Sequence, residues 1–160
     1  MIMIGNKNEF GVELVLSLNH KNRGFARVWF GGKFLSTIYD EIYIKSYLLN
    51  LLDDIYKCEI LDKDFKSFSE KHVFNTMNKY IINEHCDSIN YLLRGSTFTD
   101  CFVIFCFKTR GVIHLVWKKR ENYNFPDVIE QGDQIFSYKI TEEKYFLLLT
   151  KLKFEICKFI

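Results

Sequence analysis

The sequence contains only one proline and eight glycines among its 160 residues. Stretches rich in these residues are typical of linkers and disordered segments, so we expect a folded chain with little of either. No apolar run reaches the roughly eighteen residues that a membrane-spanning helix requires. The first residues, MIMIGNKNEF, also lack the basic start and apolar stretch of a secretory signal. We therefore expect no membrane partner.

An excess of charge of either sign is also missing, since 22 basic residues are balanced by 20 acidic ones. Nucleic-acid-binding domains usually carry a clear basic excess, so no nucleic-acid partner is expected. The five cysteines are odd in number, irregularly spaced and never arranged as CxxC, which makes a poor disulfide framework. Free thiols are typical of the reducing cytoplasm, where we expect the protein to act.

The motifs of common catalytic and metal sites are absent as well. The four histidines occur in neither HxxxH nor HExxH spacing, and the chain has no GxSxG, GxGxxG or phosphate-binding-loop motif. Paired carboxylates do occur, as in Asp53-Asp54 and Glu142-Glu143. Such neighbours are usually solvated charges on a helix surface, and acidic residues in a first turn favour the helix dipole. We expect no enzymatic activity, no cofactor and no metal.

Apolar and aromatic residues are plentiful. Hydrophobic residues make up 48% and aromatic residues 17% of the chain, beside an ordinary 26% of charged residues. A chain of this length can bury one good core, so we expect a single domain over residues 1–160.

Alternating apolar residues predict a first group of strands, over residues 12–18 and 25–30. The Gly31-Gly32 pair that follows can supply the two positive φ angles of a type I′ turn without steric cost. We therefore expect a tight hairpin that returns the chain into a third strand over residues 33–38.

Three helices are predicted from apolar residues that recur at helical spacing, over residues 41–57, 68–84 and 142–158. Asp40 is the expected N-cap of the first helix, and Thr141 that of the third. Ser67 and Glu70 have the spacing of a capping box at the start of the second.

A second group of strands is predicted over residues 101–107, 112–117 and 134–140. The first of these is apolar at every position, which favours a central strand buried on both faces. Because strands and helices each come in clusters, the expected class is α+β with antiparallel sheet. Two three-strand clusters, at about 10–38 and 101–140, are packed by the three helices.

Several segments of the chain resemble a known family. They are IGNKNEFGVELVL near the start, GFARVWFGGKFLSTIYDE after it, and a late strand that runs into TEEKYFLLL. These segments are similar to the immunity proteins of bacterial polymorphic-toxin and contact-dependent growth-inhibition systems, closest to the immunity protein 42 family. The resemblance is best over residues 2–56, weaker over 100–150, and does not include 57–99. It implies a small cytoplasmic α+β protein without catalytic activity that binds and neutralises one cognate toxin domain.

The segment ENYNFPDVIEQGD, residues 121–133, is the candidate toxin-binding site, because it combines four carboxylates with two aromatic residues and has no lysine or arginine. Aromatic side chains can anchor in a partner's pocket, and carboxylates can orient a basic partner such as a nuclease toxin. The expected contact residues are Glu121, Tyr123, Phe125, Asp127, Glu130 and Asp133. On this interpretation, reversing the charges of Asp127, Glu130 and Asp133 should cost little stability. The alternative is a solvated loop with Phe125 and Val128 packed on the core.

A different class of function starts from Lys118-Lys119-Arg120, a dense basic cluster that follows Trp117. A small nucleic-acid-binding or regulatory module would use this cluster, together with the sheet face, to contact phosphates. The more usual interpretation of such a cluster is the charged end of a strand. The residues do not decide between a monomer and a weak dimer.

Overall fold

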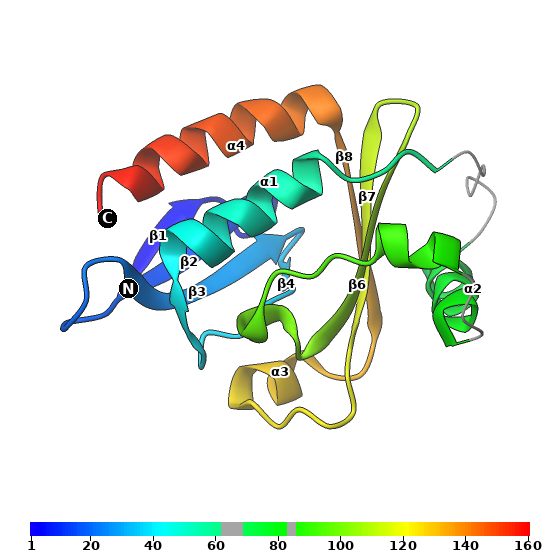
Figure 1. Ribbon diagram of the computed structural model, residues 1–160, viewed down its shortest axis with the longest axis horizontal. Coiled ribbons are helices and arrows are strands. Elements are labelled where there is room, and N and C mark those ends of the chain that lie inside the picture. Colours follow the sequence, from blue (N-terminus) through cyan, green and yellow to red (C-terminus); the bar gives the residue numbers. More distant parts are fainter. Residues whose placement is uncertain (62–68, 83–85) are drawn as a thin grey trace.

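A computed structural model describes residues 1–61, 69–82 and 86–160, and contains two antiparallel sheets with helices around them (Figure 1). The N-terminal sheet contains β1 (Ile2–Gly5), β2 (Phe10–Leu16), β3 (Arg23–Phe30), β4 (Lys33–Phe34) and β5 (Glu41–Tyr43). Neighbouring strands β1, β2 and β3 pair in chain order, while β4 and β5 pair with opposite ends of β3 along its other edge. The predicted class, α+β with antiparallel sheets, is confirmed.

The tight hairpin predicted at Gly31-Gly32 is present. The two glycines have φ angles of +57° and +78°, and Phe30 pairs with Lys33 across the two-residue turn. The strand that follows is much shorter than the predicted 33–38, because a side chain replaces the backbone in the ladder. Leu35 N–H donates to the Val28 carbonyl at 3.1 Å, but Val28 N–H donates to Ser36 Oγ at 2.8 Å.

Other predictions for this sheet need correction at the ends of strands. β2 begins earlier than predicted and stops pairing at Leu16, opposite Gly24, so Leu18 lies fully exposed in the following loop. β1 and β5 were not predicted, because strands of four and three residues are too short to show a period.

The C-terminal sheet contains β6 (Phe102–Thr109), β7 (Val112–Lys119) and β8 (Ile135–Thr141), in that order. β7 is therefore the central strand, and the prediction that residues 101–107 form the central strand is wrong. Most of β6 is nevertheless buried on both faces, as predicted. Its free edge is partly covered, since Leu61 N–H donates to the Lys108 carbonyl and Leu93 N–H to the Ile104 carbonyl, both at 2.8 Å.

The helix predicted over 41–57 is composite. Residues 41–43 form β5, a π-helical segment follows at Ile44–Leu49, and α1 covers only Asn50–Tyr56. Asp40 therefore lies outside the helix and does not cap it. The predicted apolar face is nonetheless correct, because all of its members are buried: Ile44, Leu48, Leu51, Leu52 and Ile55.

The other two predicted helices are confirmed within a few residues. α2 spans Glu70–Ile82, and the Ser67 of its predicted capping box lies outside the described residues. α4 spans Glu142–Cys157, and its predicted N-cap Thr141 accepts a hydrogen bond from Lys144 N–H at 3.3 Å. Short 3-10 turns occur at Cys86–Tyr91 and Thr97–Thr99, and a further helix, α3, at Pro126–Gln131.

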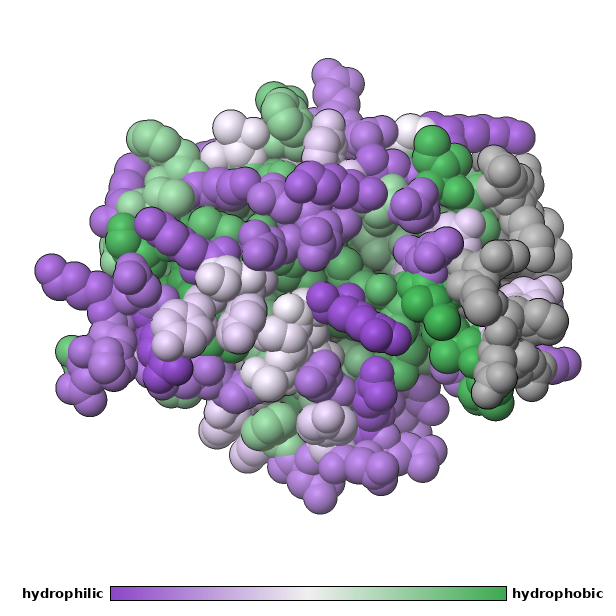
Figure 2. All heavy atoms as spheres, viewed as in Figure 1, coloured by the Kyte–Doolittle hydropathy of each residue, from purple (hydrophilic) through white to green (hydrophobic). Residues whose placement is uncertain are grey.

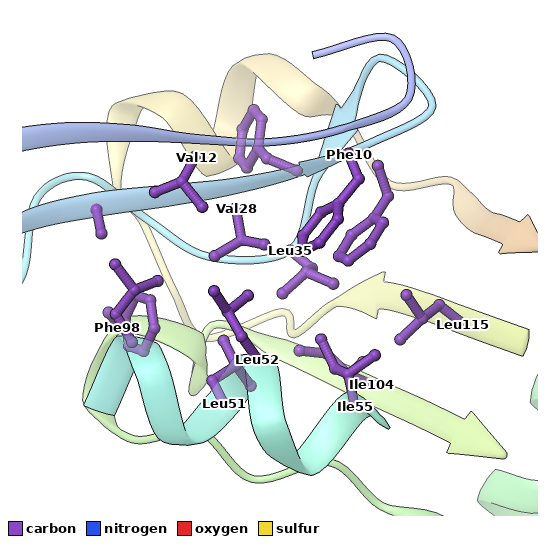
Figure 3. Close-up of a cluster of buried hydrophobic side chains, with 14 of the residues drawn as sticks. Phe10, Val12, Val28, Leu35, Leu51, Leu52, Ile55, Phe98, Ile104 and Leu115 are labelled. Atoms are coloured by element: carbon purple, nitrogen blue, oxygen red, sulfur yellow. The ribbon is translucent and has the colours of Figure 1, made fainter. Parts of the chain in front are cut away.

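The main core lies between the two sheets and against α1 (Figure 3), and α4 packs on it through Tyr145, Leu149, Leu152 and Ile156. Leu51, Leu52 and Ile55 of α1 point into the space between Val12 and Val28 of the N-terminal sheet and Ile104 and Leu115 of the C-terminal sheet. Burial of this apolar surface is the main stabilising term, at roughly 25 cal/mol per Å².

Two further contacts complete the layers. The buried Tyr145 hydroxyl of α4 donates to the Leu52 carbonyl of α1 at 2.9 Å, which ties these helices together. On the opposite face of the C-terminal sheet, α2 buries Val73, Phe74 and Met77 in a second cluster with Phe105 and Phe107. The C-terminal sheet is therefore an inner layer, covered on both faces.

The Gly31-Gly32 turn allows a direct stability test. Gly32→Val should lower the free energy of unfolding by roughly 1–3 kcal/mol, because a β-branched residue is strained at positive φ. Gly32→Asn should cost much less, since asparagine tolerates this conformation. Urea unfolding of the two variants checks the difference, and equal losses would show that side-chain bulk, not φ, decides the effect.

Candidate functional site

The candidate site is built around α3, which lies at the end of the molecule away from α4 (Figure 1). The sequence predicted a polar loop over 121–133, whereas residues 126–131 form a short helix. Pro126 occupies the first turn, after an extended Phe125, and Gly132 follows the last turn with a φ of +83°. A proline at the start and a glycine past the end are the usual helix boundary signals. The helix was missed because six residues are too few to show a helical period.

Asp127 faces the interior and anchors α3. Its side chain is only 4% exposed, and its carboxylate accepts hydrogen bonds from Arg27 Nη2 at 2.9 Å, Thr37 Oγ1 at 2.9 Å and Ile38 N–H at 3.0 Å. The expectation that Asp127 is a solvent-facing carboxylate, reversible at little cost, is therefore wrong. Periodicity could not reveal this, because the partners lie about ninety residues away in the sequence.

Gln131 anchors the other end of α3. Its side-chain amide donates to the Phe34 carbonyl at 2.8 Å and accepts from Phe34 N–H at 3.0 Å, so it extends the short β4 much as a further strand would. The buried Trp117 Nε1–H donates to the same carbonyl at 2.8 Å. The hairpin at Gly31-Gly32 therefore places Phe34 where Gln131 of α3 and Trp117 of the C-terminal sheet both hydrogen-bond to its carbonyl.

Arg27 extends this anchor into a charged network beneath the helix. Its Nη1 lies 3.2 Å from Glu13 Oε2, while its Nη2 reaches Asp127. Glu13 is almost fully buried and also accepts hydrogen bonds from Trp29 Nε1–H at 2.9 Å and from the Lys7 ammonium. Because desolvated charges are costly unless paired, this network makes α3 a firmly held element.

The pKa of Glu13 reflects these contacts. Burial acts to raise the pKa, but the hydrogen bonds from Lys7 and Trp29 and the positive charges of Arg27 and Lys7 outweigh it. The pKa of Glu13 therefore lies below its ordinary value of 4.5, and the carboxylate stays ionised at neutral pH.

Aromatic and apolar side chains lie on α3 and on the segments next to it. Phe125 stacks on Tyr39 with ring centroids 6.4 Å apart and contacts Tyr123 at 6.3 Å. Tyr39 is 54% exposed and Ile129 is 52% exposed, whereas Tyr123 and Phe125 are half-buried against the main core. We call the set Tyr39, Glu121, Tyr123, Phe125, Ile129 and Glu130 the α3 surface.

Tyr39 was missed by the sequence reasoning. It is held beside α3 because the preceding Ile38 N–H donates to Asp127 and its own N–H donates to Thr37 Oγ1 at 3.1 Å. An aromatic residue in a polar turn was the available signal, but its neighbour in space depends on the tertiary fold.

The remaining predicted carboxylates differ in their surroundings. Glu121 and Glu130 are exposed, and in the part of the chain that the structure describes neither forms an ion pair. Asp133 is also exposed but lies 3.4 Å from Lys118 Nζ. The structure therefore brings Tyr123 and Phe125 together on one surface with two unpaired carboxylates, and turns Asp127 inward and Asp133 toward the basic cluster.

The basic cluster at 118–120 is partly engaged by neighbouring groups. Besides the Lys118–Asp133 pair, Arg120 Nε donates to the Phe102 carbonyl at 3.2 Å. Among the described residues, the main core covers one face of the C-terminal sheet and α2 covers part of the other, which leaves the nucleic-acid-binding alternative little of this sheet to use.

Two groups capable of reactive chemistry lie together, since a hydrogen bond with Cys106 lowers the pKa of the Cys58 thiol, while His114 and Cys101 have other surroundings. His114 is half-buried, stacks on Phe107 and lies 2.6 Å from Thr109 Oγ1, and burial and then the charge of Lys139 lower its pKa. Burial raises the pKa of the Cys101 thiol to about 12, which makes it a poor nucleophile. Among the described residues, no three metal-ligating side chains converge, and none of the helices could cross a membrane.

The protein has a mixed α+β fold, in which a polar network around Arg27 holds the exterior helix α3 in place. Comparison with family models shows which family this is. The model of immunity protein 42 matches residues 1–155, and the chain belongs to this family. The match confirms the resemblance and extends it through residues 57–99.

Solved structures contain the same fold. A crystal structure of CdiI from Burkholderia dolosa AUO158 aligns with a TM-score of 0.64 over 96% of this chain and 99% of that chain. The two sequences are 12% identical, so the likeness concerns the fold. A search of curated proteins found no match.

The role assigned to Asp127 predicts a stability effect. Asp127→Asn should lower the free energy of unfolding by about 2–4 kcal/mol, because it leaves Arg27 with one carboxylate instead of two. The matched control is Asp133→Asn, which removes an exposed carboxylate and should cost less than about 0.5 kcal/mol. Chemical denaturation distinguishes the two, and equal losses would contradict the anchoring role of Asp127.

The lowered pKa of Glu13 predicts a pH effect. As the pH falls, the unfolded chain takes up a proton on Glu13 near its ordinary pKa of 4.5, before the folded protein does. Stability contributed by this group is therefore complete above that value and is lost as the pH falls through the lower folded pKa. Urea unfolding across this range should show a steeper loss for the natural protein than for Glu13→Gln. Parallel pH profiles would assign the acid sensitivity to other groups.

Proposed function

We propose that this protein binds the toxic domain of one cognate secreted toxin and neutralises it in the cytoplasm of the cell that makes both. The observation that carries this proposal is membership of the immunity protein 42 family over residues 1–155. The protein acts as a stoichiometric inhibitor and not as an enzyme.

The α3 surface is proposed as the toxin-binding surface. Interface hot spots are often aromatic side chains that need little ordering on binding, and here Phe125 already contacts both Tyr39 and Tyr123. The helix beneath them is held near both ends, because the buried Asp127 carboxylate accepts from Thr37 Oγ1 and the Gln131 amide donates to the Phe34 carbonyl. Binding therefore does not have to order this part of the chain.

The charges of this surface favour a basic partner. Glu121 and Glu130 are exposed beside the aromatic group, and neither forms an ion pair with another described residue. Both carboxylates can therefore contact a partner. A nuclease needs a basic cleft to hold phosphates, so we propose that the toxin is a nuclease and that the α3 surface occludes its active site.

A binding experiment with the toxin domain encoded beside this gene tests the surface. Tyr39→Ala should weaken the complex roughly tenfold or more, mainly through faster dissociation. Reversal of Glu121 and Glu130 to lysine together should slow association and reduce its dependence on salt. The control reverses Glu70 and Asp54, which lie on α2 and α1, and makes the same change in net charge.

The outcomes separate the parts of the proposal. If both α3-surface variants bind the toxin as tightly as the natural protein does, the α3 surface is not part of the interface. The family assignment would not be affected. A toxin that degrades neither DNA nor RNA would contradict the nuclease class. A ternary complex of toxin, immunity protein and a substrate oligonucleotide would contradict occlusion of the active site.

A further inference from the structure

Two cysteines that are far apart in the sequence lie next to each other at the end of α1. Cys58 follows this helix, and Cys106 lies on β6. Both approach the Ile55 carbonyl oxygen, to which Cys58 N–H donates at 3.5 Å and which lies 3.7 Å from Cys106 Sγ. The two thiols also form a hydrogen bond with each other. The last turn of α1 therefore holds two sulfur atoms in contact.

The backbone after α1 keeps the two cysteines in register. Ile60 forms a parallel bridge with Lys108, whose N–H donates to the Glu59 carbonyl at 2.9 Å. Two residues earlier along each segment lie Cys58 and Cys106. Adjacent strands are about 4.8 Å apart, within the range of about 4.4–6.8 Å between Cα atoms that a disulfide requires. A bond between the two sulfur atoms therefore needs little movement of the backbone.

The two thiols differ in exposure and in their electrostatic surroundings. Cys106 is only 2% exposed, and burial raises its pKa well above the ordinary value. Cys58 is half-buried, and the hydrogen bond with Cys106 lowers its pKa despite this burial. The positive charge of Lys108 lowers it further, although the ion-pair partner of this lysine, Glu142, opposes the effect. Because the thiolate is the nucleophilic form of cysteine, Cys58 is the reactive member of the pair.

An open cavity of about 350 Å³ gives small molecules a route to the pair, since both cysteines line it. The cavity lies between the end of α1 and the segment that precedes β6. Figure 2 shows hydrophilic and hydrophobic atoms mixed over the face that α1 crosses. The cavity lining is mixed in the same way, and its charged members are Asp54, Lys57, Glu59 and Arg94. This lining suits a small polar molecule such as hydrogen peroxide.

We propose that Cys58 and Cys106 form a peroxide-sensitive site, in which Cys58 is oxidised first and Cys106 then converts it to a disulfide. The Cys58 thiolate attacks hydrogen peroxide, the O–O bond breaks, and the products are a sulfenic acid and, after uptake of one proton, water. The Cys106 sulfur next attacks the Cys58 sulfur. The S–S bond forms, the S–O bond breaks, and the departing hydroxide takes the Cys106 proton to form a second water.

The electrons balance, because the two thiols lose two electrons and the peroxide gains two. In a reducing compartment, a small thiol such as glutathione reverses the reaction by exchange with the disulfide. Disulfides that form transiently under such conditions are typical of redox-sensing proteins. The proposal does not depend on the toxin, and its test needs only the purified protein.

Peptide mapping after mild oxidation is the first test. Hydrogen peroxide should link Cys58 to Cys106 with the loss of two hydrogen atoms, and dithiothreitol should reverse the link. Chymotrypsin cleaves after phenylalanine and so separates Cys106 from the nearby Cys101. The matched control is Cys157→Ser, which removes an exposed thiol of α4 and should leave the link unchanged. A disulfide that joins Cys58 to any other cysteine, or the absence of a link, would overturn the proposal.

Trapping with dimedone, which reacts with sulfenic acids, tests the order of the two steps. In Cys106→Ser the sulfenic acid at Cys58 has no thiol to react with, so the dimedone adduct there should increase over that of the natural protein. Cys106→Ala should give the same result if serine destabilises this buried position. In Cys58→Ser neither a disulfide nor an adduct at Cys106 should form. An adduct at Cys106, or oxidation of the more exposed Cys157 before Cys58, would contradict the assigned roles.

Discussion

The α3 surface depends on one interior arrangement, the guanidinium of Arg27 held between the carboxylates of Glu13 and Asp127. The antiparallel register places Glu13 directly opposite Arg27 on neighbouring strands, and α3 brings Asp127 to the other side of the guanidinium. A largely buried guanidinium without both partners would cost several kcal/mol, so the position of α3 is fixed by charge pairing as well as by packing. Val128, fully buried beside Asp127, adds the apolar part of the same contact.

The two sheets have different roles, and their sequences differ accordingly. The C-terminal sheet lies between the main core and α2, so β6 needs apolar residues on both faces. The N-terminal sheet packs on the core with one face, and β3 alternates strictly between buried and half-buried positions. The half-buried positions carry Arg27 and Trp29, which both contact Glu13 on the face turned away from the main core.

The regular elements could be predicted because their periods lie in local sequence. The apolar faces of the helices and the turn at Gly31-Gly32 are examples, since side-chain spacing and φ alone decide them.

The features that the sequence did not predict depend on contacts between residues far apart in the chain. β6 is apolar because α2 covers it, not because it is central, and the start of the first predicted helix became β5 because β3 offered it a free edge. At the candidate site, the acidic and aromatic composition pointed to residues 121–133, but Asp127 turned inward because its partners come from β3 and the segment after β4. Nothing local distinguishes such an aspartate from Glu130, three residues later.

In the short helix α3, the residues that hold the helix to the sheets lie on one face and the exposed residues lie on the other. Asp127, Val128 and Gln131 follow the i, i+1, i+4 pattern of one helix face, and they hold the helix to the sheets. Ile129 and Glu130 lie on the opposite side and contribute little to that attachment. Substitutions on the outward side can therefore change the exposed surface while the charge pairing beneath it stays intact. For the proposed toxin-binding role this division is an advantage, because specificity can change without loss of the fold that presents it.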